Sequence, residues 1–266
     1  MKSSKRTQVW FFVLLMAVSV LLIGYWTNNA AAAEPKKDEG KKDEGKKIYE
    51  SRCIICHGDK GDGKGLVDVV HRNEKKGMVW NVFPRDFTSG VFKFRSTPTG
   101  CLPTDEDLKR VITSGIPRAY MPSSADLPDE SVKAVIKYIK TFSNRWKDEE
   151  ACKPIPVKKA QYVGSADSVK KGEQLWDKMK CWECHGKEGK GDGPKSDSLK
   201  DDWGDKVLPF DFTSGATKMG FAPENVYVAY TTGLDGTGMP SFQDSLSEDD
   251  RWNLVSYTLK LMGRLQ

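Results

Sequence analysis

The feature that most constrains this chain of 266 residues is a sequence that occurs twice. "CIICHGDKGDGKG" from Cys53 matches "CWECHGKEGKGDG" from Cys181, with the glycines in register. Three further blocks recur in the same order: "FPRDFTSG" and "LPFDFTSG", "TSGIPRAYMP" and "TTGLDGTGMP", "LPDESVKAVIKYIK" and "LSEDDRWNLVSYTL". Each copy is about a hundred residues long, an ordinary size for one domain. The duplication therefore predicts two tandem domains, called here the first and second repeat, rather than a solenoid of shorter units.

The boundaries of these domains follow from breaks in the pattern. We expect the first domain at 46–147 and the second at 168–266, joined by a linker at 148–167 in which prolines and charges interrupt the periodicity. A charged run, "KKDEGKKDEGKK", precedes the first domain and predicts a solvated linker at 34–45.

Residues 1–33 predict a signal peptide or an N-terminal membrane anchor. A basic start, "MKSSKRTQ", leads into an apolar run from Val9 to Trp26 and then into small residues, "NNAAAAEP", that suit cleavage. The apolar run would be about 27 Å long as a helix, which is just enough to span a bilayer. Both alternatives predict that the rest of the chain is exported, either periplasmic or anchored and facing the periplasm.

The bulk composition is that of a soluble globular protein, with 38% hydrophobic and 30% charged residues. The formal net charge is +5, but Lys2, Lys5 and Arg6 near the start contribute much of it. No arginine-rich stripe with interleaved aromatic residues follows, so we expect no nucleic-acid partner.

The local patterns predict an all-α fold. Short helices are expected over "KKIYESRCIICHG" and "GEQLWDKMKCWECHG", and another from the cap Thr104 to Gly115. We expect the last helix of the first repeat to begin with Asp129 as its cap, and that of the second with a capping box from Ser247 to Asp250. The residues expected to face inward on these two helices are Val132, Val135, Ile136, Ile139, Trp252, Val255 and Leu259.

The spacing C-x-x-C-H is that of covalent haem c attachment. Two cysteines three residues apart lie one helical turn apart on the same face, and the histidine that follows can direct a ring nitrogen at the group they hold. The pattern predicts two haem c groups, attached through thioether bonds at Cys53, Cys56, Cys181 and Cys184, with His57 and His185 as iron ligands. A zinc site built from both cysteine pairs is the alternative, but it does not explain the histidine after each pair.

With these motifs the sequence resembles a di-haem cytochrome c built from two class I cytochrome c domains. The resemblance implies a helix carrying each attachment motif, a later loop that supplies a methionine as the sixth iron ligand, and a C-terminal helix that packs on the first. Met121 in "GIPRAYMPSS" and Met239 in "GLDGTGMPSF" are the matching methionines. It also implies a backbone carbonyl that orients each histidine, from a proline-containing stretch at which Pro84 and Pro209 match.

Cys101 and Cys152 lie outside both motifs. In an oxidising compartment two such cysteines are expected to form a disulfide, and the alternative is that Cys101 ligates a haem.

The function predicted from these features is a relay of single electrons between redox partner proteins, with no catalytic residues. Histidine and methionine together leave the iron no open position for a substrate. One alternative is a haem enzyme, either peroxidase-like or a sulfur-compound dehydrogenase. Another is a haem-bearing docking subunit of a larger oxidoreductase complex, docking through the inserted segments at 71–82 and 92–107. By analogy with the family, partners include membrane-bound or molybdenum-containing oxidoreductases, and the N-terminal helix makes a membrane a further partner.

Overall fold

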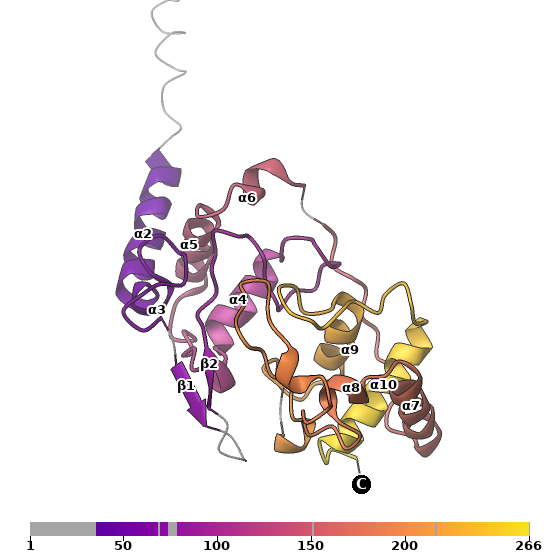
Figure 1. The fold of residues 1–266 in the computed structure, drawn as a ribbon. Coiled ribbons are helices and arrows are strands. Elements are labelled where there is room, and N and C mark those ends of the chain that lie inside the picture. The colour runs from indigo at the N-terminus through magenta and orange to yellow at the C-terminus, as the bar shows by residue number, and fades with distance from the viewer. Residues whose placement is uncertain (1–35, 69, 74–78, 151, 216, 266) are drawn as a thin grey trace, which may run out of the picture. The chain divides into compact units, whose positions relative to one another are not determined.

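The fold is a computed structural model, and it describes residues 36–68, 70–73, 79–150, 152–215 and 217–265. Nearly all regular structure in these segments is helical, which confirms the predicted all-α class (Figure 1). The chain divides into two compact units, Met1–Asp43 and Glu44–Gln266, and the second of these contains both repeats. The predicted signal or anchor at 1–33 lies outside the described residues. Among the helices that are described, none combines the length and apolar character that crossing a membrane requires.

Each repeat begins with a long helix that leads into a single turn carrying the cysteine motif. In the first repeat these are α2 (Lys36–Arg52) and α3 (Ile54–His57), and in the second α7 (Ala166–Lys178) and α8 (Trp182–His185). The first of these helices starts about ten residues earlier than expected, because lysine and glutamate are favourable helix formers. Most of the segment predicted as a charged linker at 34–45 is therefore helical.

The first and last helices of each repeat cross at backbone distance. A β-carbon on Gly45 of α2 would lie 2.2 Å from the carbonyl oxygen of Ala134 in α5 (Asp129–Lys140). At the matching place in the second repeat, a β-carbon on Gly172 would lie 2.1 Å from the carbonyl oxygen of Asn253 in α10 (Glu248–Leu261). Only glycine fits at such a distance. The crossing therefore fixes how the last helix of each repeat lies on the helix that leads into the motif (Figure 1).

Each crossing is buried beside an aromatic residue of the first helix. Tyr49 is 1% exposed in the first core and Trp176 is 1% exposed in the second, each four residues after the crossing glycine. The apolar faces predicted for the last helices are confirmed, since every residue expected to face inward is buried: Val132, Val135, Ile136, Ile139, Trp252, Val255 and Leu259.

The helix starts follow the expected signals with one exception. α4 (Asp105–Ser114) has Thr104 as its cap in a full capping box with Asp107. At the start of α10 the Ser247 hydroxyl accepts from the Asp250 N–H, which is one of the two bonds of the capping box predicted there. The prediction that Asp129 caps α5 is wrong, because Pro128 occupies the cap and Asp129 is the first helical residue. Its carboxylate instead pairs with Lys133 one turn later, with 2.8 Å between nitrogen and oxygen.

Among the described residues, a short antiparallel hairpin is added to the helical plan. β1 (Val70–Asn73) pairs with β2 (Val79–Val82) in the first repeat, inside an inserted segment that has no counterpart in the second. The remaining helices are α6 (Arg145–Asp148) and α9 (Pro223–Thr232), with 3₁₀ turns at Pro117–Ala119, Ser196–Ser198 and Phe212–Ser214.

Candidate functional site

The two attachment motifs have the same local geometry. Cys53 precedes α3 and His57 ends it, just as Cys181 precedes α8 and His185 ends it. The glycine after each histidine has a positive φ, 75° in the first motif and 78° in the second, which stops the turn there. All four motif thiols are free and half-buried. Each motif thus presents two thiols and an imidazole from a single helical turn.

Each motif histidine is held in one tautomer by a backbone carbonyl. Nδ1 of His57 donates to the carbonyl oxygen of Arg85 at 3.0 Å, and Nδ1 of His185 donates to that of Phe210 at 3.2 Å. A carbonyl can only accept, so the proton sits on Nδ1 and Nε2 keeps its lone pair. Burial lowers the pKa of both imidazoles below the ordinary value for histidine. Both rings are therefore neutral and ready to bind a metal through Nε2.

The orienting carbonyls belong to the residues after the two prolines that the sequence indicates. The carbonyl oxygens of Pro84 and Pro209 face the glycine loops instead, 2.8 Å from a β-carbon built on Gly63 and 2.6 Å from one built on Gly191. The expectation that Pro84 and Pro209 themselves orient the histidines is therefore corrected by one residue. Consecutive carbonyls of an extended chain point in opposite directions, so only the next one reaches the imidazole.

The repeated "DFTSG" block places a phenyl ring against each histidine, a contact that the sequence analysis missed. Phe87 stacks on His57 with ring centroids 4.4 Å apart, and Phe212 lies 5.0 Å from His185. The recurrence of the phenylalanine in this block, after each motif, is the signal that could have found this contact.

The methionine loops are closed in the same way in both repeats. The N–H of Ile116 donates to the carbonyl oxygen of Met121 at 2.9 Å, and the N–H of Leu234 donates to that of Met239 at 3.0 Å. Two residues after each methionine, a serine hydroxyl donates back to the preceding helix: Ser123 to Thr113 at 2.5 Å and Ser241 to Thr231 at 2.6 Å. The backbone of each loop is thus fixed at both ends around its methionine.

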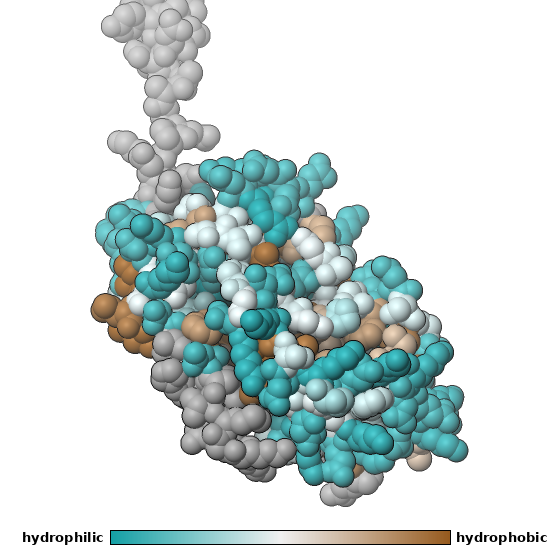
Figure 2. Space-filling model, in the orientation of Figure 1, coloured by the Kyte–Doolittle hydropathy of each residue, from teal (hydrophilic) through white to brown (hydrophobic). Residues whose placement is uncertain are grey.

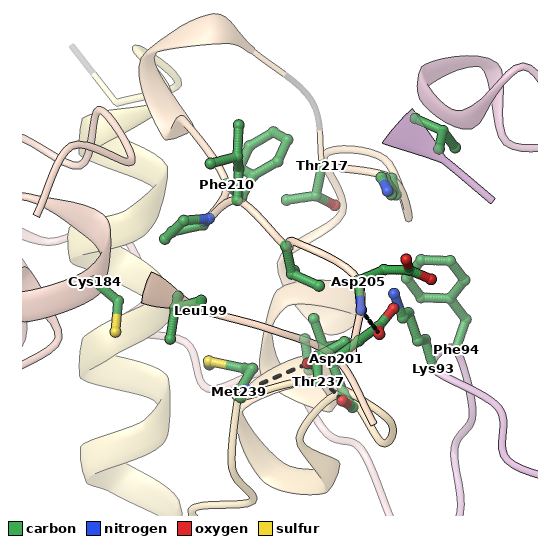
Figure 3. Close-up of a pocket in the computed structure, with 18 of the residues that line it drawn as sticks. Lys93, Phe94, Cys184, Leu199, Asp201, Asp205, Phe210, Thr217, Thr237 and Met239 are labelled. Carbon is green, nitrogen blue, oxygen red and sulfur yellow. Dashed lines mark hydrogen bonds between the residues drawn. The ribbon is translucent and has the colours of Figure 1, made fainter. Parts of the chain in front are cut away.

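A cavity of about 1010 Å³ brings the predicted groups of the second repeat together. Its lining includes Cys181, Cys184, His185 and Met239. Figure 3 shows the sulfur-bearing side chains of Cys184 and Met239 on either side of Leu199 around this space. The lining of this cavity does not include His57 or Met121, whose placement rests on the hydrogen bonds given above.

The residues around the cavity fit a haem. Its volume is at the upper end of the range, about 300–1,000 Å³, that is usual for cofactor sites. Two thiols and a neutral imidazole are the attachment and ligand groups that haem c requires. Trp176 lines the same space, and its buried Nε1–H has no hydrogen-bond partner in the described part of the chain. A bound group with an acceptor at that position would satisfy this donor.

The four motif thiols do not form a zinc site. Within the described residues, no group of three or more histidine, cysteine or acidic side chains is arranged to hold a metal ion. The two cysteine pairs therefore serve separate sites, which disfavours the zinc alternative.

Cys101 and Cys152 form a disulfide, with their Cα atoms 6.1 Å apart and a sequence separation of 51. The alternative in which Cys101 ligates a haem is therefore wrong for this structure. The bond ties the segment before α4 to the segment after α6 and so encloses the Met121 loop in sequence.

A lysine of the first repeat also lines the cavity. The pKa of Lys93 is lowered to about 7, mainly by burial and also by the positive charges of Arg85 and Lys218, while Asp201 and Asp202 oppose the shift. The first repeat therefore contributes a titratable group to the surroundings of the second repeat's motif.

Two family models match separate parts of the chain. The family described as "Cytochrome c" matches residues 169–261, and the family described as "Cytochrome C oxidase, cbb3-type, subunit III" matches residues 40–139. A chain of the reducing HAO-like protein complex of Kuenenia stuttgartiensis is similar over most of its length. It is 39% identical with a TM-score of 0.74, and the match covers 84% of this chain and 96% of that one. None of the curated proteins matches the sequence.

Proposed function

Because this chain belongs to the cytochrome c family, we propose that it is an exported di-haem cytochrome that relays single electrons between partner proteins. Two haem c groups, attached through the four motif cysteines, supply iron that cycles between the ferrous and ferric states. Haem-based electron transfer is common to both matching families, and the relay between partners is the finer proposal.

The observation that carries this proposal is the pair of carbonyl-held imidazoles. His57 and His185 each have a proton fixed on Nδ1 by a backbone oxygen, although they lie more than a hundred residues apart in the chain. Such a bond orients the ring and raises the basicity of the nitrogen that binds the metal. Its presence in both repeats supports two sites of the same kind.

The sixth position of each site is proposed for methionine, Met121 in the first repeat and Met239 in the second. Support comes from the matched closure of their loops and, for Met239, from the fact that it lines the same cavity as His185. Sulfur ligation favours the reduced iron and blocks the position at which an enzyme would bind substrate. A peroxidase-like enzyme or a sulfur-compound dehydrogenase would need one of these loops to release its methionine.

The domain limits at 46–147 and 168–266 are proposed on the same grounds. The family matches at 40–139 and 169–261 fall close to them. The export of the chain to the periplasm is also a proposal, and it rests on the basic and apolar start of the sequence.

The partner proposed for this cytochrome is a multi-subunit redox complex. The support is the similar chain of Kuenenia stuttgartiensis, which is part of a reducing HAO-like protein complex, and the match covers nearly all of that chain. This choice is narrower than the membrane-bound or molybdenum-containing oxidoreductases that the family analogy indicates. We therefore propose an HAO-like oxidoreductase as the first partner to test.

An apolar surface beside the first attachment motif suits such a partner. Ile55 of α3 is 50% exposed, and Leu66 and Val67 of the following glycine loop are 93% and 39% exposed. On the face shown in Figure 2, which is otherwise mostly hydrophilic, apolar residues gather over α3. Contact there would bring a partner to the thioether side of the first haem, close to Cys56.

The proposal is tested on protein matured in a host that attaches haem c. Intact mass gives the number of attached haems, and the optical spectrum of the oxidised protein shows the near-infrared charge-transfer band of methionine bound to ferric iron. We expect two haems, a band intensity that corresponds to two sulfur-ligated irons, and no binding of cyanide at rest. Bare polypeptide would overturn the proposal, and one high-spin haem that binds cyanide readily would favour the enzyme.

A further inference from the structure

We propose that the first repeat positions the methionine loop of the second. The contact that does so is an ion pair between Arg95 of the first repeat, which is fully buried, and Asp235, which is partly buried in the loop before Met239. Both are positioning residues that act through the loop backbone. This inference rests on the proposed function, because it concerns how Met239 is kept in place as an iron ligand.

Arg95 reaches the second repeat from a fully buried position. Its side chain is 0% exposed, and Nη2 lies 2.7 Å from a carboxylate oxygen of Asp235. The same nitrogen donates to the carbonyl oxygen of Thr232, the last residue of α9, at 2.7 Å. The guanidinium therefore holds both the end of the helix and the loop that leaves it. A guanidinium at this depth requires such partners, because an unpaired buried charge is strongly destabilising.

The carboxylate of Asp235 has three donors from the first repeat. Besides the ion pair, it accepts from the hydroxyl of Thr99 at 2.7 Å and from the backbone N–H of Gly100 at 2.8 Å. All three donors lie within seven consecutive residues of the first repeat, 95–101, which we call the strap. A carboxylate held by one cation and two hydrogen bonds from one rigid segment has a single orientation.

Asp235, which carries this carboxylate, is part of the closed methionine loop. The loop is closed by the hydrogen bond from Leu234 to the carbonyl of Met239, and the hydroxyl of Thr237 accepts from the N–H of Met239 at 3.2 Å. Asp235 lies between these residues, so fixing its carboxylate fixes the middle of the loop. The position of the Met239 backbone then follows from the position of the strap.

The matching loop of the first repeat is stiffened by a proline. Where the second repeat has Asp235, the first has Pro117, which fixes φ and begins a 3₁₀ turn. Where the second has Gly236 and Gly238, the first has Arg118 and Tyr120. The loop of the second repeat is thus intrinsically the more flexible of the two, since glycine has the largest backbone freedom. The contacts with the strap give the second methionine loop the rigidity that proline gives to the first loop.

The strap is itself anchored to α4 of the first repeat and to the segment that follows this repeat. Cys101 at its end is bound to Cys152, and the N–H of Ile155 donates to the carbonyl of Ser96 at 2.8 Å. The carboxylate of Asp107 in α4 accepts from the N–H of Ser96 at 2.8 Å. These bonds give the strap a fixed position against which the loop of the second repeat is held.

The experiment measures how easily an added ligand displaces methionine in the ferric, fully haem-loaded protein. Imidazole is titrated into wild type and into Asp235→Asn, Arg95→Met and Thr99→Val, with the near-infrared methionine band and intact mass recorded for each. Asp167→Asn is the control, because it removes the same charge from an exposed ion pair of the second repeat, with Lys171 at 2.8 Å.

We expect one of the two haems to bind imidazole about tenfold more tightly in Asp235→Asn and Arg95→Met, the effect of losing a hydrogen bond to a charged group. Thr99→Val, which removes one exposed hydrogen bond and leaves the ion pair, should give a smaller rise of about threefold. The other haem and the control should be unchanged. The Thr99→Val protein keeps the test valid if the variants of Arg95 and Asp235 fold poorly.

The inference would be overturned if imidazole affinity were unchanged at both haems in Thr99→Val and in those variants of Arg95 and Asp235 that fold. Its failure is distinguishable from failure of the proposed function. If wild type lacks the methionine band at one haem, Met239 or Met121 is not a ligand and the proposed function is wrong. If wild type shows both methionine bands and the variants bind imidazole with the wild-type affinity, only the proposed role of the Arg95–Asp235 pair is wrong.

Discussion

Gly172 lies so close to Asn253 that a β-carbon on it would be 2.1 Å from the carbonyl oxygen of that residue. A side-chain rearrangement cannot relieve this clash, because the β-carbon would meet the backbone of α10. The matching pair in the first repeat, Gly45 and Ala134, has almost the same approach at 2.2 Å. The crossing of first and last helices is thus a repeated contact that depends on one residue type.

Replacing Gly172 by alanine should therefore destabilise the protein even though alanine is the better helix former. We expect a loss of about 1–3 kcal/mol in unfolding free energy, the usual cost of overpacking a tight contact, measured by chemical denaturation. Lys170→Ala in the same helix is the control, since that side chain is exposed. A Gly172→Ala protein as stable as wild type would show that the two helices separate without cost.

Replacing either proposed sixth ligand should affect one haem and leave the other intact. In Met239→Ala or Met121→Ala we expect the near-infrared band to fall by half and one haem to bind cyanide. The potential of that haem should fall by on the order of 0.1 V, within the roughly 0.8 V over which axial ligands set haem potentials. Met219→Leu, in the lining of the same cavity as Met239, is the control and should keep the full band. A full band in the Met239 variant would remove that residue from the iron.

Loss of the disulfide should destabilise the fold without touching haem attachment. Replacing Cys101 and Cys152 by alanine opens a loop of 51 residues, for which chain entropy gives about 4 kcal/mol. Denaturation of the oxidised protein with and without reductant measures this difference, and the double variant should match the reduced wild type. Alkylation after reduction should label two cysteines, since the other four are expected in thioether bonds. Six labelled cysteines would contradict the attachment.

Stability should rise with pH above neutrality because of Lys93. Its pKa is lowered to about 7 from an ordinary 10.5, so between these values the unfolded chain binds the extra proton. Unfolding free energy then increases with pH, by up to about 1.4 kcal/mol per unit for one proton. Below pH 7 the buried charge lowers stability in full. Lys93→Met should therefore be more stable than wild type near pH 6, with the difference shrinking toward pH 10. A difference independent of pH would show that Lys93 keeps its proton.

The apolar faces and most helix starts could be predicted because they depend on neighbours in the chain. Val132 and Ile136 lie one turn apart, and Thr104 caps through a residue three positions on, so sequence spacing alone indicates their partners. The orienting carbonyls were missed by one residue because the direction of a peptide group depends on backbone torsions. No side-chain pattern reports whether Pro84 or Arg85 turns its oxygen toward His57.

Contacts between the repeats could not be predicted for a different reason. Arg95 and Asp235 are 140 positions apart. Arg95 lies in an insertion, and Asp235 stands where the matching block of the first repeat has Pro117, so the duplication does not indicate that the two residues pair. Only the packing of the two repeats shows that the arginine is buried. The hairpin of β1 and β2 likewise lies in an insertion too short to show a clear alternation.

The contacts between the two methionine loops and the opposite repeats run in both directions. Arg118, three residues before Met121, donates to the hydroxyl of Ser214 at 2.7 Å and lies over the ring of Phe210, whose carbonyl holds His185. Asp235, four residues before Met239, is bound by the strap. Each repeat thus contributes contacts that hold the methionine loop of the other, so the two repeats are not structurally equivalent. A chain made of two copies of the same repeat would lack one of these sets of contacts, so one of its methionine loops would be unsupported.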